Sequence, residues 1–146
     1  MRHHHTDHDG AFLELAEAAR IAIANPKLAP YGMAAKESLT ALGLWQTYEK
    51  RIVMGQNIAQ AFQIVAAGGA PVGFVALSQL LSAPENLRGS NWTVPVDLHS
   101  QIRQDAVLLR RGAGNHAAEG FLAFLTSPTG CAITRDAGYQ PPDACK

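Results

Sequence analysis

Between residues 20 and 81, short β-branched apolar runs alternate with longer segments that have a helical pattern, and this order constrains the fold most. The three runs are RIAIA at 20–24, KRIVMG at 50–55 and APVGFVALSQLL at 70–81. Runs of this length and composition are typical of buried strands. Strand, helix, strand, helix and strand in succession predict an α/β fold with a parallel-type sheet flanked by helices. We expect the third run to continue into a loop or a short helix.

Two helices are expected between these strands. The first covers 31–42 and stops at Gly43, the residue type that most often takes the left-handed conformation after a helix. The second begins after Asn57, which can cap it, and ends at Gly68 and Gly69. Its apolar residues recur at helical spacing: Ile58, Ala61, Phe62 and Val65.

After His99 the pattern changes. The run QDAVLLR at 104–110 resembles a strand, and NHAAEGFLAFL at 115–125 predicts an amphipathic helix. Ser127 and Pro128 predict the cap and first residue of a last helix, which Gly138 ends. Near the start, GAFLELAEAAR at 10–20 predicts a lead-in helix.

Composition excludes several classes of protein. The chain has 146 residues, 47% hydrophobic and 16% charged, which suits one compact α/β unit. Twelve basic residues balance twelve acidic ones, so no overall field attracts nucleic acid or an anionic membrane. No apolar run approaches the roughly 18 residues of a membrane span, and the start, MRHHHTDHDG, lacks the apolar core of a signal peptide. We therefore expect no export signal in this chain.

Histidines and cysteines give no metal signature. The cluster His3, His4, His5 and His8 is more simply a tag remnant or an unstructured leader than a metal site. Cys131 and Cys145 have no CxxC spacing, so they either pair in an exported protein or remain two free thiols. The motifs GxSxG, GxxxxGK[ST] and HExxH are absent, and no nucleophile can be paired with a base, which argues against an enzyme.

Two strand-to-helix junctions, before Tyr31 and before Ile58, remain as candidate sites. Each places a helix N-terminus at the carboxyl edge of the predicted sheet, where N–H groups and the helix dipole favour an anion. Tyr31 could direct its hydroxyl at that anion, or it could pack its ring on Pro30. For Ile58 only the backbone N–H is a candidate, because we expect its side chain in the core. Asn57 is better interpreted as a helix cap than as a ligand contact.

Three blocks of this sequence resemble the periplasmic molybdate-binding proteins of ABC importers. They are IANPKLAPYGMAAKESLTALGLW, GQNIAQAFQIVAAGGAPVGFVALSQL and VPVDLHSQIRQDAVLLRRG, and the resemblance covers about residues 20 to 142. It implies a type II periplasmic-binding-protein fold, in which two α/β lobes hold molybdate or tungstate through uncharged donors.

The resemblance also implies which residues bind the oxyanion. Tyr31 matches a position that contributes a contact from the second lobe, through its hydroxyl in some members, and Ile58 matches a position whose backbone N–H binds an oxyanion oxygen. Some members have a further tyrosine where this chain has Ala76. The ligand that the resemblance implies is molybdate or tungstate, and it implies no cofactor.

The resemblance further predicts the domain organisation. Residues 1–19 are a leader or tag with the lead-in helix, 20–102 are the second lobe, and 103–146 are the return crossing and C-terminal helices of the first lobe. The rest of the first lobe, with its two serine-type hydroxyl motifs, has no counterpart here. We therefore expect an N-terminally truncated member with half of the oxyanion shell and impaired binding.

The partners implied are a small oxyanion and the membrane permease of an ABC importer, in the periplasm. Phe121, Phe124 and Ile133 would lack a first-lobe sheet to cover, which predicts a homo-oligomer formed through the C-terminal helices. Two alternatives remain open from the sequence. One is an effector-sensing domain of a regulator, and the other is a self-associating fragment with a vestigial anion site.

Overall fold

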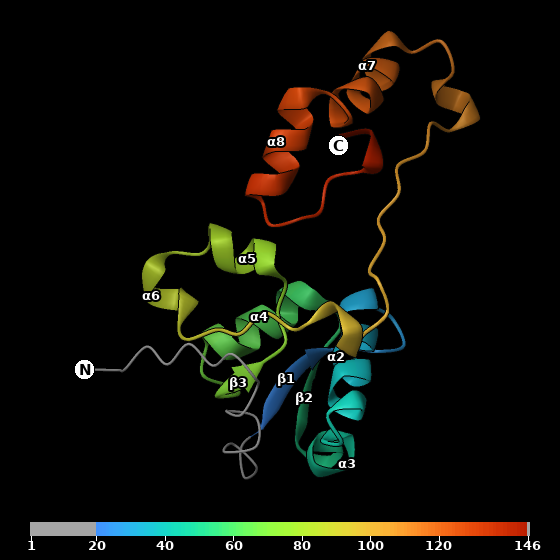
Figure 1. The fold of residues 1–146 in the computed structure, drawn as a ribbon. Helices are drawn as coiled ribbons and strands as arrows, with labels where there is room; N and C mark the ends of the chain where they lie inside the picture. The colour runs from blue at the N-terminus through green and yellow to red at the C-terminus, as the bar shows by residue number, and fades with distance from the viewer. Residues whose placement is uncertain (1–19, 146) are drawn as a thin grey trace. The chain divides into compact units, whose positions relative to one another are not determined.

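The computed structural model describes residues 20–145, and this part of the chain divides into two compact units. The division lies between Ile102 and Arg103. Figure 1 shows the elements of each unit, which are described separately below. The lead-in helix predicted for residues 10–20 lies outside the described residues except for Arg20, which is not helical.

The first unit contains a three-stranded parallel sheet, as the sequence predicts. Its strands are β1 (Ile21–Ala24), β2 (Ile52–Gly55) and β3 (Val72–Gly73), in the order β2-β1-β3. β3 is much shorter than the predicted run: Phe74 still donates to the carbonyl of Ala22 at 2.9 Å, and the chain then leaves the sheet. The expected short helix follows as α5 (Leu77–Ser82).

The two predicted helices of this unit are α2 (Pro30–Ala41) and α4 (Ile58–Ala66). Gly43 and Gly68 follow their ends with φ of 73° and 75°, the left-handed conformation expected after a helix. Shorter elements complete the unit: α3 (Trp45–Tyr48), α6 (Glu85–Arg88) and 3-10 turns at Glu49–Arg51 and Val96–Leu98.

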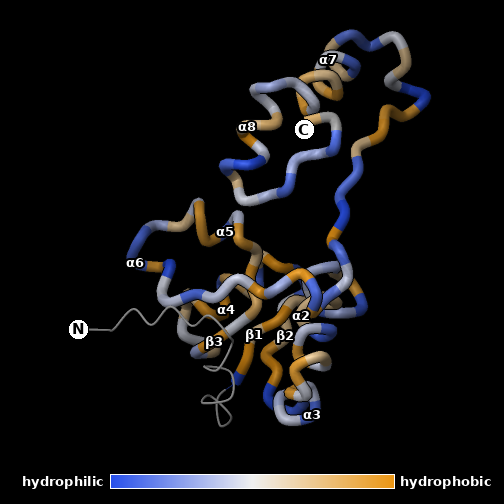
Figure 2. The backbone as a smooth tube through the Cα atoms, viewed as in Figure 1, coloured by the Kyte–Doolittle hydropathy of each residue, from blue (hydrophilic) through white to orange (hydrophobic). Residues whose placement is uncertain are grey.

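The core of the first unit is centred on β1. All four residues of this strand are fully buried, which agrees with its continuous apolar sequence in a sheet paired on both sides. Figure 2 shows β1 as a hydrophobic segment between its neighbours. The largest fully buried apolar side chains are Ile21 and Ile23 of this strand, together with Leu39 and Tyr48.

Two glycines let the helices approach the strand ends closely. A Cβ on Gly32, in the first turn of α2, would lie within 2.7 Å of the carbonyl carbon of Ala24. A Cβ on Gly55, at the end of β2, would lie 2.8 Å from the backbone nitrogen of Ala61 in α4. Both helix starts are therefore held against the carboxyl edge of the sheet.

The second unit is a pair of helices, α7 (His116–Leu125) and α8 (Pro128–Asp136), with 3-10 turns at Arg110–Gly112 and Asp143–Cys145. The predicted N-cap Ser127 is confirmed, because its hydroxyl accepts from the backbone of Gly130 at 3.1 Å. Asn115, for which no cap was predicted, accepts from the backbone of Ala117 at 3.0 Å and caps α7. Gly138, after α8, has φ of 84°.

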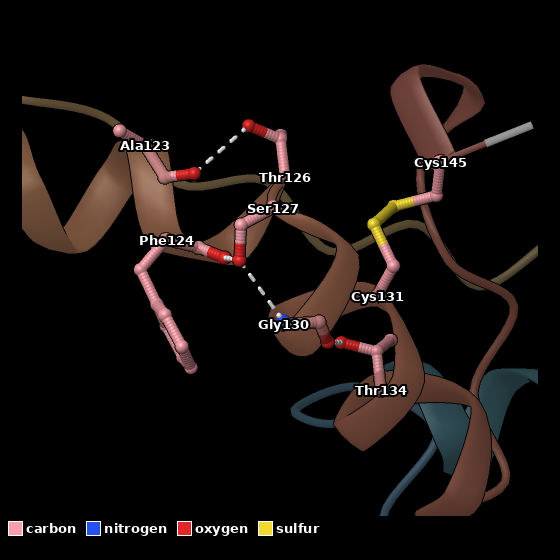
Figure 3. Close-up of a disulfide and its surroundings, with 8 residues drawn as sticks. All are labelled: Ala123, Phe124, Thr126, Ser127, Gly130, Cys131, Thr134 and Cys145. Atoms are coloured by element: carbon pink, nitrogen blue, oxygen red, sulfur yellow. Dashed lines mark hydrogen bonds between the residues drawn. A yellow bond between two sulfur atoms is a disulfide. The ribbon is translucent and has the colours of Figure 1, made fainter.

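A disulfide joins Cys131 in α8 to Cys145 in the C-terminal segment, with 5.8 Å between the Cα atoms (Figure 3). This resolves the choice between a pair and two free thiols. Cys131 is 5% exposed, and the remaining side chains of α7 and α8 are at most half-buried. The disulfide is thus the most buried side-chain feature of this unit.

The strand predicted at 104–110 is wrong. Residues 104–109 are in no strand of the described structure, and Arg110 begins a 3-10 turn. Val107 is 78% exposed and Leu109 is 67% exposed. A short apolar run forms a strand only where another strand pairs with it, and residues 20–145 supply no such partner.

Candidate functional site

The two predicted site residues border one cavity in the first unit. This cavity has a volume of about 300 Å³, and both Tyr31 of α2 and Ile58 of α4 line it. They are 27 residues apart in the sequence and come together because β1 and β2 are parallel neighbours whose carboxyl ends meet at one edge.

The N-terminus of α4 has two N–H groups that are not used within the described structure. Asn57 caps the helix as predicted, because its Oδ1 accepts from the backbone of Gln60 at 3.0 Å. The carboxamide of Gln60 in turn accepts from the backbone of Gln56 at 2.7 Å. Among residues 20–145, the N–H groups of Ile58 and Ala59 find no acceptor. These donors and the positive end of the helix dipole suit an anion.

The N-terminus of α2 has fewer donors to offer. Pro30 has no N–H, and the carbonyl of Ala29 accepts from both Gly32 at 2.9 Å and Met33 at 3.1 Å. Tyr31 is half-buried at the cavity wall. A hydroxyl there would supplement the few backbone donors of this helix start.

The side chain of Ile58 does not lie where we expected it. It is half-buried at the cavity wall and is not among the fully buried residues of the core. The reason is that the first residue of α4 stands at the rim of the sheet, beyond the last paired residue of β2. Ala76, where some relatives have a tyrosine, is 3% exposed and is not a lining residue.

The cavity carries little charge. Among the described lining residues there is no Asp or Glu, and the basic side chains are Arg88 and His99. Arg88 donates from Nε to the carbonyl of Ala83 at 2.9 Å and from Nη2 to that of Leu81 at 3.0 Å. The absence of carboxylates from this wall leaves nothing that would repel a dianion.

A long-range contact that the sequence did not indicate holds one wall of the cavity. The carboxylate of Glu37, on α2, accepts from the backbone of Ser100 at 2.6 Å and from its hydroxyl at 3.3 Å. This pair joins α2 to the segment that contributes His99 and Ile102 to the lining. Glu37 is 63 positions from Ser100, so no local pattern could reveal the contact.

The described residues contain neither a cluster of metal ligands nor a helix that could span a membrane. Within residues 20–145 no group of three His, Cys, Asp or Glu side chains could hold a metal ion, and the His3, His4, His5 and His8 cluster lies outside these residues. In the same part of the chain, every helix is too short or too polar to cross a membrane.

Comparisons with a family model and with individual proteins agree that this chain is similar to bacterial solute-binding proteins. The family of bacterial extracellular solute-binding proteins matches residues 2–140. The molybdate-binding protein ModA of Rhodobacter capsulatus is 47% identical over 133 residues, which are 91% of this chain and 51% of that protein. ModA of Azotobacter vinelandii is 44% identical over 135 residues, 92% of this chain and 54% of that protein. The chain spans about half the length of the curated relatives it matches.

The fold has a solved counterpart. The periplasmic molybdate-binding protein of Azotobacter vinelandii matches with a TM-score of 0.82 and 38% identity, over 94% of this chain and 61% of that one. The predicted type II periplasmic-binding-protein fold and the resemblance quoted from the sequence are confirmed. These relatives are named as binding proteins for an anion. Their names agree with the predictions that the ligand is an anion, that no cofactor is needed and that the family binds its ligand without catalysing a reaction.

Proposed function

Since the chain belongs to the bacterial extracellular solute-binding proteins, we propose that it binds a tetrahedral oxyanion, molybdate or tungstate, for delivery to an ABC importer. The hydroxyl of Tyr31 and the backbone N–H of Ile58 are the proposed ligand groups. Of these two anions, molybdate is the one for which the relatives at 44–47% identity are named.

The observation that carries this proposal is the meeting of Tyr31 and Ile58 at one cavity. The α4 start has two N–H donors without an acceptor in the described residues, and the described cavity wall has no carboxylate. Hydrogen bonds from uncharged donors to a charged acceptor contribute about 1.5 to 3 kcal/mol each. A few such donors can therefore hold a dianion without a matching charge.

We propose that half of the oxyanion shell comes from this chain, which makes binding weaker and less selective than a complete shell would. Residues 20–102 correspond in this proposal to the second lobe, and residues 103–146 to the return crossing and C-terminal helices of the first. The chain spans about half of its relatives' length, so the donors of their remaining half are not supplied by the described residues.

The proposed location is the periplasm, and the proposed macromolecular partner is the permease of the importer. The Cys131–Cys145 disulfide supports this location, because disulfides persist in oxidising compartments such as the bacterial periplasm. The solved counterpart is itself described as periplasmic.

Calorimetric titration of the purified chain with molybdate tests the proposed function, with tungstate as a second ligand and with sulfate and phosphate as controls. The oligomeric state of the sample is measured by light scattering beforehand. We expect heat of binding for molybdate or tungstate beyond that for both controls. Equal binding of all four anions, or none, would contradict the proposal.

Self-association is a second proposal, favoured by the exposed apolar side chains of the second unit. Phe121, Phe124 and Ile133 are 60%, 41% and 55% exposed. We propose that two copies of the chain cover these side chains together, through α7 and α8.

A further inference from the structure

The cavity of the first unit is larger than a tetrahedral oxyanion requires. Its volume is about 300 Å³. With about 30 Å³ for each water-sized group, that volume has room for roughly ten non-hydrogen atoms. An oxyanion with four oxygens fills about half of it. Cavities that bind small organic molecules begin at about 300 Å³.

The wall of this cavity is mostly apolar and comes from several segments of the chain. Large apolar side chains that are only partly buried come from α4, from the residues after β3, from α5 and from the 91–94 segment. Besides Ile58, they include Phe62, Val65, Phe74, Leu80, Trp92 and Val94. Covering these groups with an apolar ligand would remove them from water, which is favourable at about 25 cal/mol for each Å².

The positive charge on this wall favours a ligand with a negative charge. Arg88 is the one residue among the described lining that always carries a charge. Its Nε and Nη2 donate to backbone carbonyls, while its Nη1 donates to no residue in 20–145. A carboxylate can accept from this nitrogen, whereas a cation would meet a like charge and no described acidic group.

We propose that the cavity binds a small organic acid of about ten non-hydrogen atoms in all, the size of phenylacetate, with an apolar body and one carboxylate. The apolar body lies against the aromatic and aliphatic wall, and the carboxylate accepts from Arg88. This ligand class goes beyond the oxyanion proposal and does not rest on it, because neither Tyr31 nor Ile58 is needed to hold the apolar body.

The experiment is a calorimetric titration of the full chain with phenylacetate in oxyanion-free buffer. Phenylacetamide has the same body without the charge, and acetate has the charge without the body. We expect phenylacetate to bind at least tenfold more tightly than either. Equal affinity for phenylacetamide would overturn the role of Arg88, and equal affinity for acetate would overturn the role of the apolar wall.

Substitutions place the binding in this cavity. Val94→Phe fills the space and should weaken phenylacetate binding at least tenfold, whereas Val96→Phe makes the same change at a residue that is 79% exposed and is not a lining residue. Arg88→Lys keeps the charge and should retain most of the affinity that Arg88→Gln loses. Circular dichroism verifies that each variant is folded. A folded Val94→Phe protein with unchanged affinity would refute the proposed location.

Discussion

At the scale of single residues, the hydroxyl of Tyr31 is the proposed side-chain ligand. Tyr31→Phe removes one hydrogen-bond donor and leaves the ring at the cavity wall. We expect molybdate binding to weaken by about 1 to 2 kcal/mol, a factor of about 5 to 30 in the dissociation constant. Calorimetry measures the change. If the variant binds molybdate as well as the parent chain, the ring only packs, as in the alternative that the sequence left open.

The backbone N–H of Ile58 can be removed without ending the helix. Ile58 is the first residue of α4, where proline is well tolerated, and Asn57 already has the extended conformation (φ −145°, ψ 176°) that a following proline requires. Ile58→Pro should weaken molybdate binding by about 1.5 to 3 kcal/mol, the contribution of one hydrogen bond to a charged group.

Ile58→Val is the matched control, because it keeps the N–H and trims the side chain. Circular dichroism should show unchanged helix content in both variants. Equal affinity of the proline and valine variants would exclude the N–H of Ile58 as a ligand.

Gly32 determines how closely α2 approaches β1, and with it the place of Tyr31. An added methyl would collide with the backbone of Ala24, which cannot move without disturbing the sheet. We expect Gly32→Ala to reduce the free energy of unfolding by about 1 to 3 kcal/mol, as overpacking does. Gly120→Ala is the contrasting variant: a Cβ there meets nothing within 4 Å, so the helix should gain up to about 1 kcal/mol. Urea unfolding measures both, and a neutral Gly32→Ala would contradict the packing argument.

Residue by residue, the sequence predicted best what short-range chemistry decides. Asn57 and Ser127 cap their helices as predicted, because each is a good acceptor directly before a helical pattern. The rim position of Ile58 and the Glu37–Ser100 contact depend on residues far apart in the chain. The cavity as a whole has the same origin, so its apolar wall could not be foreseen.

At the scale of elements, the disulfide stabilises α8 against a weak local core. The bond closes a loop across a separation of 14 residues, which restricts the unfolded chain by about 3 kcal/mol in the entropic model. We expect a Cys131→Ser, Cys145→Ser double variant to lose about this much stability in the second unit. Urea unfolding with and without a thiol reductant measures it, since the reductant should destabilise the parent chain and leave the double variant unaffected. A parent chain insensitive to reduction would contradict this role.

The elements also show where a pattern is insufficient. RIAIA became β1 because strands on both sides pair with it, whereas QDAVLLR remained unpaired although it too contains four consecutive apolar residues. Strand formation depends on the partner as well as on the segment. The helices needed no such partner for their boundaries, because caps and glycines determine those locally.

At the scale of the whole molecule, the exposed apolar side chains of the second unit lead to the proposal of self-association. Phe121→Glu places a charge three positions from Phe124, on the same face of α7, and burying that charge in an interface is unfavourable. We expect the parent chain to form a dimer or larger oligomer whose dissociation constant rises at least tenfold in this variant. Light scattering over a concentration series measures it.

The control for this prediction is Ala123→Glu, which adds the same charge to the same helix. Ala123 lies about 200° around α7 from Phe121, on the opposite side, and is also exposed. A general effect of net charge would weaken association equally in both variants, whereas an interface through Phe121 and Phe124 is affected by the first alone. A parent chain that remains monomeric at all concentrations would contradict the proposed self-association. Phe121 and Phe124 would then stay exposed to water, which lowers solubility.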